Sequence, residues 1–308
     1  MPSPRAGESR EDFLDRCIPE VVAEGRDADQ AVAMCIAYYE GEKDKAFNLD
    51  KMGEVEYWKA VDRTRESYQS KYEREVAKAF REQLSIYENP STPADLRKDI
   101  DSKPIEDVFV KIYREVGDRF ARNTFAGLKN MPYSEMKQPA WMDVLENQYA
   151  LRLAFTQIRG INDTTKKIIA LIIMQGFEEG KSIQEISEEI QLMGGQLFTR
   201  AERIARTTII GASNAGSLEG AKSTGLNIKK QWLATPDSRT RGTNPEDKWN
   251  HRQFLDNPLI VDVNEPFVVQ GIVKGQPQID RIQFPGDPTG SPGNIINCRC
   301  TQIYITED

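Results

Sequence analysis

The last third of the chain contains a histidine and two cysteines that could bind a metal ion. His251 is the only histidine in the sequence, and one residue separates Cys298 from Cys300. Imidazole nitrogen and thiolate sulfur are preferred ligands of Zn²⁺, and structural zinc often closes small loop-rich domains. Asp237 or Asp256 could supply a fourth ligand. From the sequence we expect two buried thiols beside a hydrogen-bonded histidine and no cofactor, with zinc and an oxidised cysteine pair left as alternatives.

The loop that follows residue 235 carries charged side chains that could hold each other in place. Asp237 lies two residues before Arg239 and four before Arg241, close enough for charge-assisted hydrogen bonds in a segment without strand partners. Trp232 could anchor this loop from below. We therefore predict a structural motif. Its members are Trp232, Asp237, Arg239, Arg241, His251, Asp256, Asp287 and Arg299.

We expect no catalytic residue. A Ser-His-Asp or Cys-His site would have to use His251, and the sequence has no G-x-S-x-G elbow to present a nucleophile beside it. The glycines at 286, 290 and 293 alternate with prolines, unlike those of a phosphate-binding loop. The alternative is a hydrolase or nuclease-type enzyme built around His251, with carboxylates such as Asp237, Asp256 and Asp287 holding a metal ion.

The charge is unevenly distributed. The chain has 308 residues and a formal net charge of -7. Residues 196–308 contain 13 Lys and Arg against 12 Asp and Glu, so the first 195 residues carry the whole acidic excess. Non-specific DNA binding needs clustered positive charge, so any contact with double-stranded DNA would be local. The predicted contact residues are Lys229, Lys230, Arg239, Arg241 and Arg252.

Hydrophobic periodicity predicts an α+β protein: an elongated, mostly α-helical N-terminal two-thirds followed by a small, loop-rich α+β C-terminal domain. The predicted divisions are 1–45, 46–195 and 196–308. Apolar residues at three- and four-residue steps indicate one long helix over 54–87. Further helices are expected to begin at Thr92-Pro93 and at the capping boxes Ser182/Glu185 and Thr199/Glu202. Strands are expected at 228–235, 259–263, 266–273 and 300–305.

The first 45 residues are predicted to form two short helices that face each other. This arrangement would bring Cys17 near Cys35, and we expect both to be buried free thiols, because the sequence shows no secretory signal and so indicates a reducing compartment. The longest apolar run, at 168–174, is too short to span a bilayer, for which about 18–20 residues are needed. No membrane contact is therefore expected.

Several separated motifs carry a resemblance to a known family. They are R-I-A-R-T at 203–207, N-A-G at 214–216, Trp232, D-S-R-T-R at 237–241, His251, L-D at 255–256, P-G-D-P at 285–288 and C-R-C at 298–300. In order and spacing this set resembles the C-terminal domain of the phage Mu F-like head morphogenesis family, which are minor head proteins of tailed phages. The chain departs from the family pattern at Thr208, at Asn257 and in the length of the 241–251 loop. Residues 7–35 also resemble a short module of phage structural proteins.

The resemblance implies a non-enzymatic virion component. It would act in head morphogenesis at the portal vertex, with DNA packaging or ejection as further roles. Its expected partners are the phage portal protein, the scaffold or major capsid protein, and packaged double-stranded DNA. Its expected location is the capsid interior near the portal, after assembly in the host cytoplasm. In this scheme the apolar stripes of the helical region would contact the partner proteins.

Overall fold

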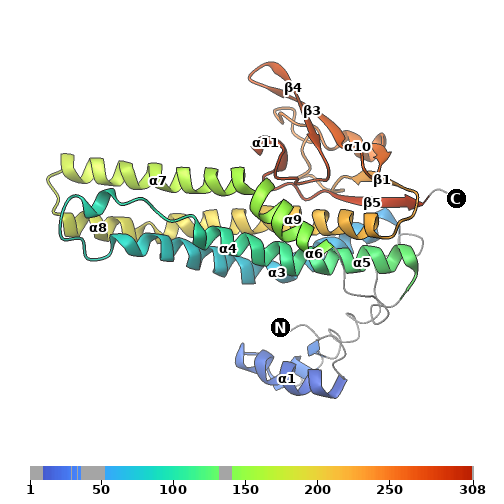
Figure 1. Ribbon diagram of the computed structural model, residues 1–308, viewed down its shortest axis with the longest axis horizontal. Helices are drawn as coiled ribbons and strands as arrows, with labels where there is room; N and C mark the ends of the chain where they lie inside the picture. Colours follow the sequence, from blue (N-terminus) through green and yellow to red (C-terminus); the bar gives the residue numbers. More distant parts are fainter. Residues whose placement is uncertain (1–9, 29, 33, 36–52, 132–140, 307–308) are drawn as a thin grey trace.

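An elongated bundle of helices carries a small β-rich unit on one side (Figure 1). This computed structural model describes residues 10–28, 30–32, 34–35, 53–131 and 141–306, and in 194–198 it describes the backbone. The predicted α+β class is confirmed. The α-helices of the bundle are α3 (Glu54–Leu84), α4 (Lys103–Ile112), α5 (Asp118–Lys129), α6 (Trp141–Asp143), α7 (Phe155–Glu178), α8 (Ile183–Leu192) and α9 (Gly194–Ser223).

The two longest helices, α3 and α9, form the spine of the bundle. The apolar stripe of α3 buries aromatic residues such as Trp58, Tyr72 and Phe80, as its periodicity predicts. A 3₁₀ turn at Ser85–Tyr87 continues α3, so the long helix predicted over 54–87 is confirmed. Helix α9 packs against both α3 and α5. These contacts bury α9 along most of its length.

Two glycines allow α9 to lie very close to the first turn of α5 and the residue before it. A Cβ atom at Gly216 would overlap the backbone oxygen of Gly117, and one at Gly220 would overlap that of Ala121. Glycines spaced by four residues lie on one face of a helix, and without side chains they let two backbones approach. The contact therefore depends on the G-x-x-x-G spacing in α9.

Two helical starts predicted from the sequence are wrong. Thr92 does not begin an α-helix: its side chain and backbone N–H bond to Asp95 before a short 3₁₀ turn, Asp95–Arg97, and α4 begins at Lys103. Thr199 lies inside α9, which already starts at Gly194. The capping box at Ser182 and Glu185 is confirmed. The two incorrect predictions show that a capping sequence can occur where no α-helix begins.

Wide π-helical turns connect parts of the bundle. Tyr113–Gly117 links α4 to α5, and Val144–Leu153 links α6 to α7. The first of these turns buries Tyr113, Val116 and Gly117 against the bundle, and Tyr113 stacks on Tyr149 from the second with ring centroids 6.3 Å apart. Such segments shift the apolar stripe of a helix, which keeps buried residues facing the core where a regular helix would turn them away.

The β-rich unit consists of a three-stranded sheet and a hairpin. Strands β1 (Ile228–Leu233), β2 (Ile260–Asp262) and β5 (Thr301–Thr306) form an antiparallel sheet in the order β2-β1-β5. Strands β3 (Phe267–Val273) and β4 (Gln276–Ile282) form the hairpin, with short helices α10 (Gln253–Asp256) and α11 (Pro292–Ile295) in the loops. The sequence analysis missed β4. A two-residue turn with positive φ at Lys274 and Gly275 makes the hairpin possible.

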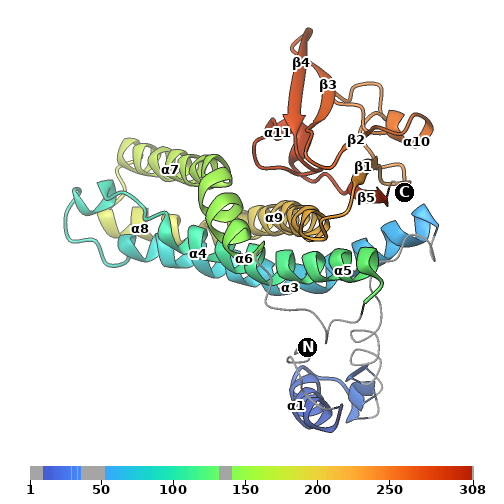
Figure 2. The same ribbon diagram turned by 45° about the vertical axis from the view of Figure 1, so that its right-hand side comes forward.

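The main hydrophobic core crosses the predicted boundary at residue 195. It joins buried residues of α3, α4, α5 and α9 to Ile228, Leu233, Ile303 and Tyr304 of the sheet. A second, smaller core lies in the β-rich unit and contains Trp232, Trp249, Phe267, Cys298 and Cys300 among its members. Figure 2 shows this unit standing on the α9 side of the bundle. The sheet is therefore attached to the helices by shared packing.

The N-terminal module has a core of its own around a disulfide bond. Helix α1 (Arg10–Ala23) buries Phe13, Cys17 and Val21 against Ala31 and Cys35. Cys17 and Cys35 are disulfide-bonded, with their Cα atoms 6.0 Å apart. The prediction of free thiols at these positions is therefore wrong, although their proximity is confirmed. The predicted start of this module, at Ser9, lies outside the described residues. Among the described helices, none is long and apolar enough to cross a membrane.

Candidate functional site

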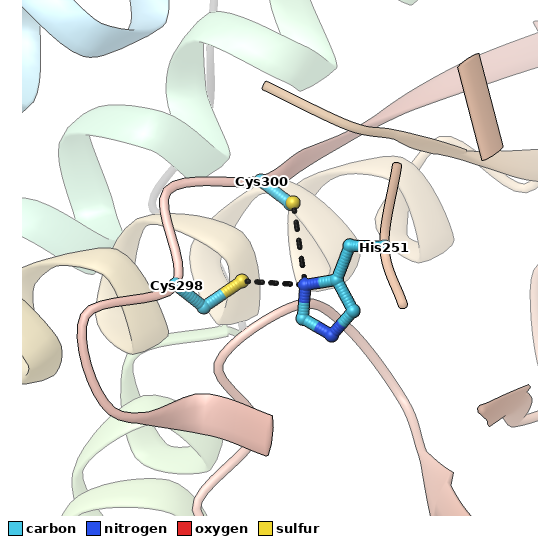
Figure 3. Close-up of side chains that lie close together, drawn as sticks. All are labelled: His251, Cys298 and Cys300. Carbon is cyan, nitrogen blue, oxygen red and sulfur yellow. Dashed lines mark hydrogen bonds between the residues drawn. The ribbon is translucent and has the colours of Figure 1, made fainter. Parts of the chain in front are cut away.

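His251, Cys298 and Cys300 meet in the small core of the β-rich unit (Figure 3). His251 precedes α10, and both cysteines lie in the loop between α11 and β5. The histidine Nδ1 lies 3.6 Å from Cys298 Sγ and 3.7 Å from Cys300 Sγ. All three side chains are at least 98% buried. Among the described residues this is the one group of three or more metal-ligand side chains whose donor atoms converge.

A chain of hydrogen bonds fixes the orientation of the His251 ring. Nε2 lies 2.6 Å from Asn294 Oδ1, and Asn294 Nδ2 donates to Asp280 Oδ2 at 2.8 Å. The Asp280 carboxylate also accepts from the backbone N–H and the hydroxyl of Ser291. Because the Asn294 amide must turn its N–H group to Asp280, its oxygen faces the histidine. Nε2 therefore carries the proton, and in the neutral ring the Nδ1 lone pair points at the two sulfurs.

Aromatic rings close one side of the cluster. Trp232 contacts His251 edge-on with ring centroids 5.1 Å apart, and its other neighbours are Phe254 and Phe267. Trp232 is fully buried in this position, and its predicted role as an anchor beneath the 237–241 loop stays a prediction. The rings exclude water and lower the local polarity, which strengthens any charge interaction inside the cluster.

The two thiols have opposite pKa shifts. A hydrogen bond with Cys300, together with burial, raises the pKa of Cys298 well above its usual value. Burial alone would also raise the pKa of Cys300, but its contacts with Cys298 and His251 outweigh burial and lower it. The two thiols are thus coupled, and Cys298 holds its proton more tightly than Cys300 does. Both sulfurs are free of disulfide bonds.

A cavity of about 230 Å³ reaches the cluster from solvent. The cluster itself and Thr235 are buried residues of its lining. Four arginines also line it: Arg206, Arg239, Arg241 and Arg299. Two carboxylates offset them, because Arg206 pairs with Glu202 while Arg239 and Arg299 both pair with Asp237. The cavity wall keeps an excess of positive charge, which suits a small anion.

The charged loop differs in one respect from its predicted arrangement. Asp237 pairs with Arg239 at 3.3 Å and with Arg299. Arg241 instead donates to the backbone oxygen of Ile296, so the predicted Asp237–Arg241 pair is absent from this loop. The long-range partner, Arg299, stacks over Trp58 of α3 with 5.2 Å between the guanidinium carbon and the ring centroid. Asp237 thus links the loop to the helical bundle.

The predicted carboxylate ligands lie away from the cluster. Asp287 accepts hydrogen bonds from the backbone N–H groups of Gln283 and Thr289, so it stabilises the conformation of its own loop. Asp256 is exposed at the end of α10. Neither these two nor Asp237 belongs to the convergent ligand group found among the described residues. The proposals of an aspartate as fourth ligand and of a carboxylate metal site are therefore wrong.

Lys230 is not available for DNA. It is fully buried, and its Nζ donates to Gln283 O at 2.8 Å and lies 4.9 Å from the centre of the Phe267 ring. The prediction that it contacts DNA is wrong, because the side chain points from β1 into the unit. Arg239 and Arg252 are exposed, whereas Lys229 and Arg241 are partly buried.

A buried arginine that the sequence analysis did not single out connects the cluster to the bundle. Arg65 of α3 donates to Ser213 Oγ at 2.7 Å and to Asn214 Oδ1 at 2.8 Å, both on α9. It also donates to the backbone oxygens of Arg299 and Cys300. Burial lowers its pKa to about 10, so it remains charged at neutral pH. In the sequence Arg65 is one charge among many on a helix that alternates in sign, and no local signal marks it as buried.

Asn214 is the centre of this network. Its Nδ2 donates to Pro285 O at 2.6 Å and to Cys300 O at 3.1 Å, and its Oδ1 accepts from Arg65 and Thr301. Asn214 thereby joins α9 to the P-G-D-P loop and to the start of β5. The N-A-G, P-G-D-P and C-R-C motifs, which are separated in the sequence and carried the family resemblance, therefore lie side by side in the structure.

Comparison with known proteins agrees with this assembly of motifs. Residues 167–303 match the family described as "Phage Mu protein F like protein". The C-terminal part of the chain is therefore similar to this family. The resemblance is thereby confirmed over these residues, which contain α9, the cluster and the β-rich unit up to the first half of β5, and the family suggests a phage head morphogenesis protein.

Two curated proteins are similar over part of their lengths. The NAD(+)--arginine ADP-ribosyltransferase EFV of Enterococcus faecalis is 30% identical over 178 residues, which are 54% of this chain and 33% of that protein. The uncharacterized protein YqbB of Bacillus subtilis is 25% identical over 209 residues, which are 66% of this chain and 63% of that protein. This chain thus spans less than two thirds of each. No solved structure matches it.

Proposed function

We propose that this chain is a minor head protein of a tailed bacteriophage that acts in head morphogenesis at the portal vertex, inside the procapsid. The observation that carries the proposal is the match of residues 167–303 to the phage Mu protein F-like family. Head proteins of this kind contribute surfaces rather than chemistry. The portal protein is the proposed partner, with scaffold or major capsid protein as further contacts and virion interior as the location.

The way the family region is built into the bundle supports this proposal. The matched region contributes α9, which packs between α3 and α5, and Arg65 crosses from α3 to the cluster loop. The helices before residue 167 therefore share a core with the family region. A partner that binds the helices would be held in a fixed orientation to the β-rich unit.

The outer face of α7 supplies a surface for a partner protein. Leu171, Met174 and Phe177 are 53%, 50% and 42% exposed and recur at three-residue steps. Apolar side chains in this pattern suit the packing of a second helix across them. We propose this face as the contact with the portal protein.

A structural role fits the cluster better than hydrolysis does. His251 is buried, its Nε2 is bonded to Asn294, and its Nδ1 faces two sulfurs. This arrangement presents no serine to the ring, and the carboxylates needed for a nuclease lie elsewhere. The relative named as an ADP-ribosyltransferase does not change this proposal, because two thirds of that protein lies outside the alignment.

The test is to purify procapsids and mature virions of the phage that encodes this chain and measure the ratio of the protein to portal protein by mass spectrometry. We expect the protein in procapsids at a fixed ratio to the portal. Its retention in mature virions would add roles in DNA packaging or ejection. Absence from both particles would overturn the proposal.

A variant pair tests the α7 surface. Leu171→Glu together with Met174→Glu places two charges on the exposed apolar face and should abolish incorporation into procapsids while the protein stays folded by circular dichroism. Lys78→Glu changes an exposed residue on the charged side of α3 and should leave incorporation unchanged. Normal incorporation of the double variant would show that the portal contact lies on another face.

A further inference from the structure

We propose that His251 Nδ1, Cys298 Sγ and Cys300 Sγ bind one Zn²⁺ ion, whose fourth coordination position opens into the arginine-lined cavity. The inference concerns a site within the family region and does not depend on the proposed role in head morphogenesis. Three observations carry it: the distances between the donor atoms, the single lone pair of the histidine, and the polar chain that orients the ring.

The donor atoms have the spacing of a tetrahedral zinc site. Bonds of about 2.3 Å to sulfur and about 2.0–2.1 Å to nitrogen, at a tetrahedral angle, place nitrogen and sulfur roughly 3.5–3.6 Å apart. The observed distances from His251 Nδ1 to the two sulfurs are 3.6 and 3.7 Å. The sulfurs also lie within 4.8 Å of each other, compatible with the ~3.8 Å edge that the same bond lengths give. An ion fits between the three atoms with little movement.

Hydrogen bonding alone does not explain why both sulfurs face one nitrogen. The neutral ring has a single Nδ1 lone pair, which can accept one S–H donor with good geometry. The second sulfur could then bond to the first sulfur, but this would not explain its approach to the nitrogen, in a core that is closed to water on the Trp232 side. A metal ion at the centre accepts the lone pair and both thiolates at once. The convergence is thus explained by three ligands around one cation.

The surroundings of His251 match those of a metal-bound histidine. Such a ring usually donates its other N–H to an amide, carbonyl or carboxylate, which fixes its orientation and raises its basicity. Here Nε2–H bonds to Asn294, which in turn bonds to Asp280. Asn294 and Asp280 are both more than 90% buried and lie on different segments, α11 and β4. They are the outer partners of the proposed site.

The fourth position faces the cavity, since all three ligand residues line it and no carboxylate does. His251, Cys298, Cys300 and Thr235 are buried residues of the cavity lining. The hydroxyl oxygen of Thr235 is buried and has no hydrogen-bond partner. A zinc-bound water could donate to it, and a small oxyanion such as phosphate could replace that water beside the arginines. Zinc binding by two thiols releases their remaining protons to solvent.

The decisive measurement is the metal content of the full chain, purified without a metal-affinity tag and dialysed against Zn²⁺. We expect one zinc per chain. In the Co²⁺-loaded protein we expect the intense visible bands of tetrahedral cobalt and a sulfur-to-cobalt charge-transfer band. Cys298→Ser with Cys300→Ser should bind less than a tenth of the wild-type metal. Cys17→Ser with Cys35→Ser is the matched control and should keep full stoichiometry, because that disulfide lies in a separate core.

The proposal is overturned if folded wild-type protein binds no zinc, or if the metal survives loss of both Cys298 and Cys300. Mass spectrometry that finds a Cys298–Cys300 disulfide in protein purified under reducing conditions would overturn it too. Rapid alkylation of Cys300 in the presence of zinc would instead indicate a thiolate–imidazolium pair. The zinc content, the disulfide mapping and the alkylation are measured on the wild-type chain, so the proposal can be overturned even if the double variant fails to fold.

Two further variants address the parts of the site beyond the sulfurs. Asn294→Ala should weaken zinc affinity about 10- to 100-fold through the histidine, with the cobalt bands retained at saturating metal. Added phosphate should shift the visible bands of the cobalt protein, and Arg241→Met should weaken that response. Bands that do not respond to phosphate or any other small anion would overturn the open fourth position.

Discussion

Lys230 should make the stability of this protein rise with pH in a range where most proteins change little. The side chain is fully buried on β1, and burial, with a smaller contribution from Lys222, lowers its pKa from 10.5 to about 7. The unfolded chain keeps the ordinary value. Between about pH 7 and 10.5 the unfolded state therefore binds more protons than the folded state, so the free energy of unfolding increases with pH.

The size of this effect follows from the shift. A difference of about 3.5 pKa units corresponds to about 5 kcal/mol between fully protonated and fully deprotonated conditions, at about 1.4 kcal/mol per unit. Between pH 7 and pH 9 the gain is about 2 kcal/mol. Lys230→Met removes the titrating group and keeps an unbranched chain over Phe267. It also leaves the oxygen of Gln283 without this donor, which costs about 1–3 kcal/mol at every pH.

The assay is urea denaturation followed by circular dichroism at pH 7, 8 and 9. We expect the wild-type free energy of unfolding to increase relative to Lys230→Met by about 2 kcal/mol over this range. The control Lys78→Met, at an exposed position of α3, should follow the wild-type curve. Parallel curves for wild type and Lys230→Met would refute the reasoning, since they would mean that the buried lysine keeps its proton above pH 9.

Three other tests address separate parts of the structure. Arg65→Met should lower the free energy of unfolding by about 3–5 kcal/mol, because it breaks a buried charged network; a loss below 1 kcal/mol in denaturant titration would contradict that role. Gly216→Ala should destabilise by about 1–3 kcal/mol through overlap with the neighbouring backbone, whereas Gly160→Ala, with open space around it in α7, should stabilise by about 0.5–1 kcal/mol. Equal melting shifts for the two would rule out the close helix contact. Cys17→Ser with Cys35→Ser should lower the stability of the N-terminal module by about 3 kcal/mol, seen as faster proteolysis of that module alone.

The long helices and the positions of most strands were predictable because their signals are local. The apolar stripe of α3 and the capping box of α8 depend on residues within a few turns of each other, and both are confirmed. The start of α9 was not predictable from the sequence. Thr199 and Glu202 form a valid capping pattern, but the helix already begins at Gly194. Strand β4 was missed because a proline and alternating polar residues weaken its pattern, and its pairing with β3 compensates.

The residues of the candidate site could be named from the sequence, but their partners could not. His251, Cys298 and Cys300 stand out as rare residue types capable of metal chemistry, and their spacing relative to other motifs revealed the family. Cys298 and Cys300 are 47 and 49 residues from His251 in the chain, so whether the three side chains meet depends on how distant loops pack together. Asn294 has no such local distinction.

By itself, then, the sequence determined the fold class, the phage Mu F-like region and the residue types of the candidate site, because composition, periodicity and motif order are properties of the chain. The tertiary structure alone decided which charges are buried. It placed Lys230 inside the β-rich unit, Arg65 between two helices and Cys17 against Cys35. The physical reason is that burial and pairing depend on residues far apart in the chain, and the free energy of a charge or a thiol depends on those neighbours more than on its own type.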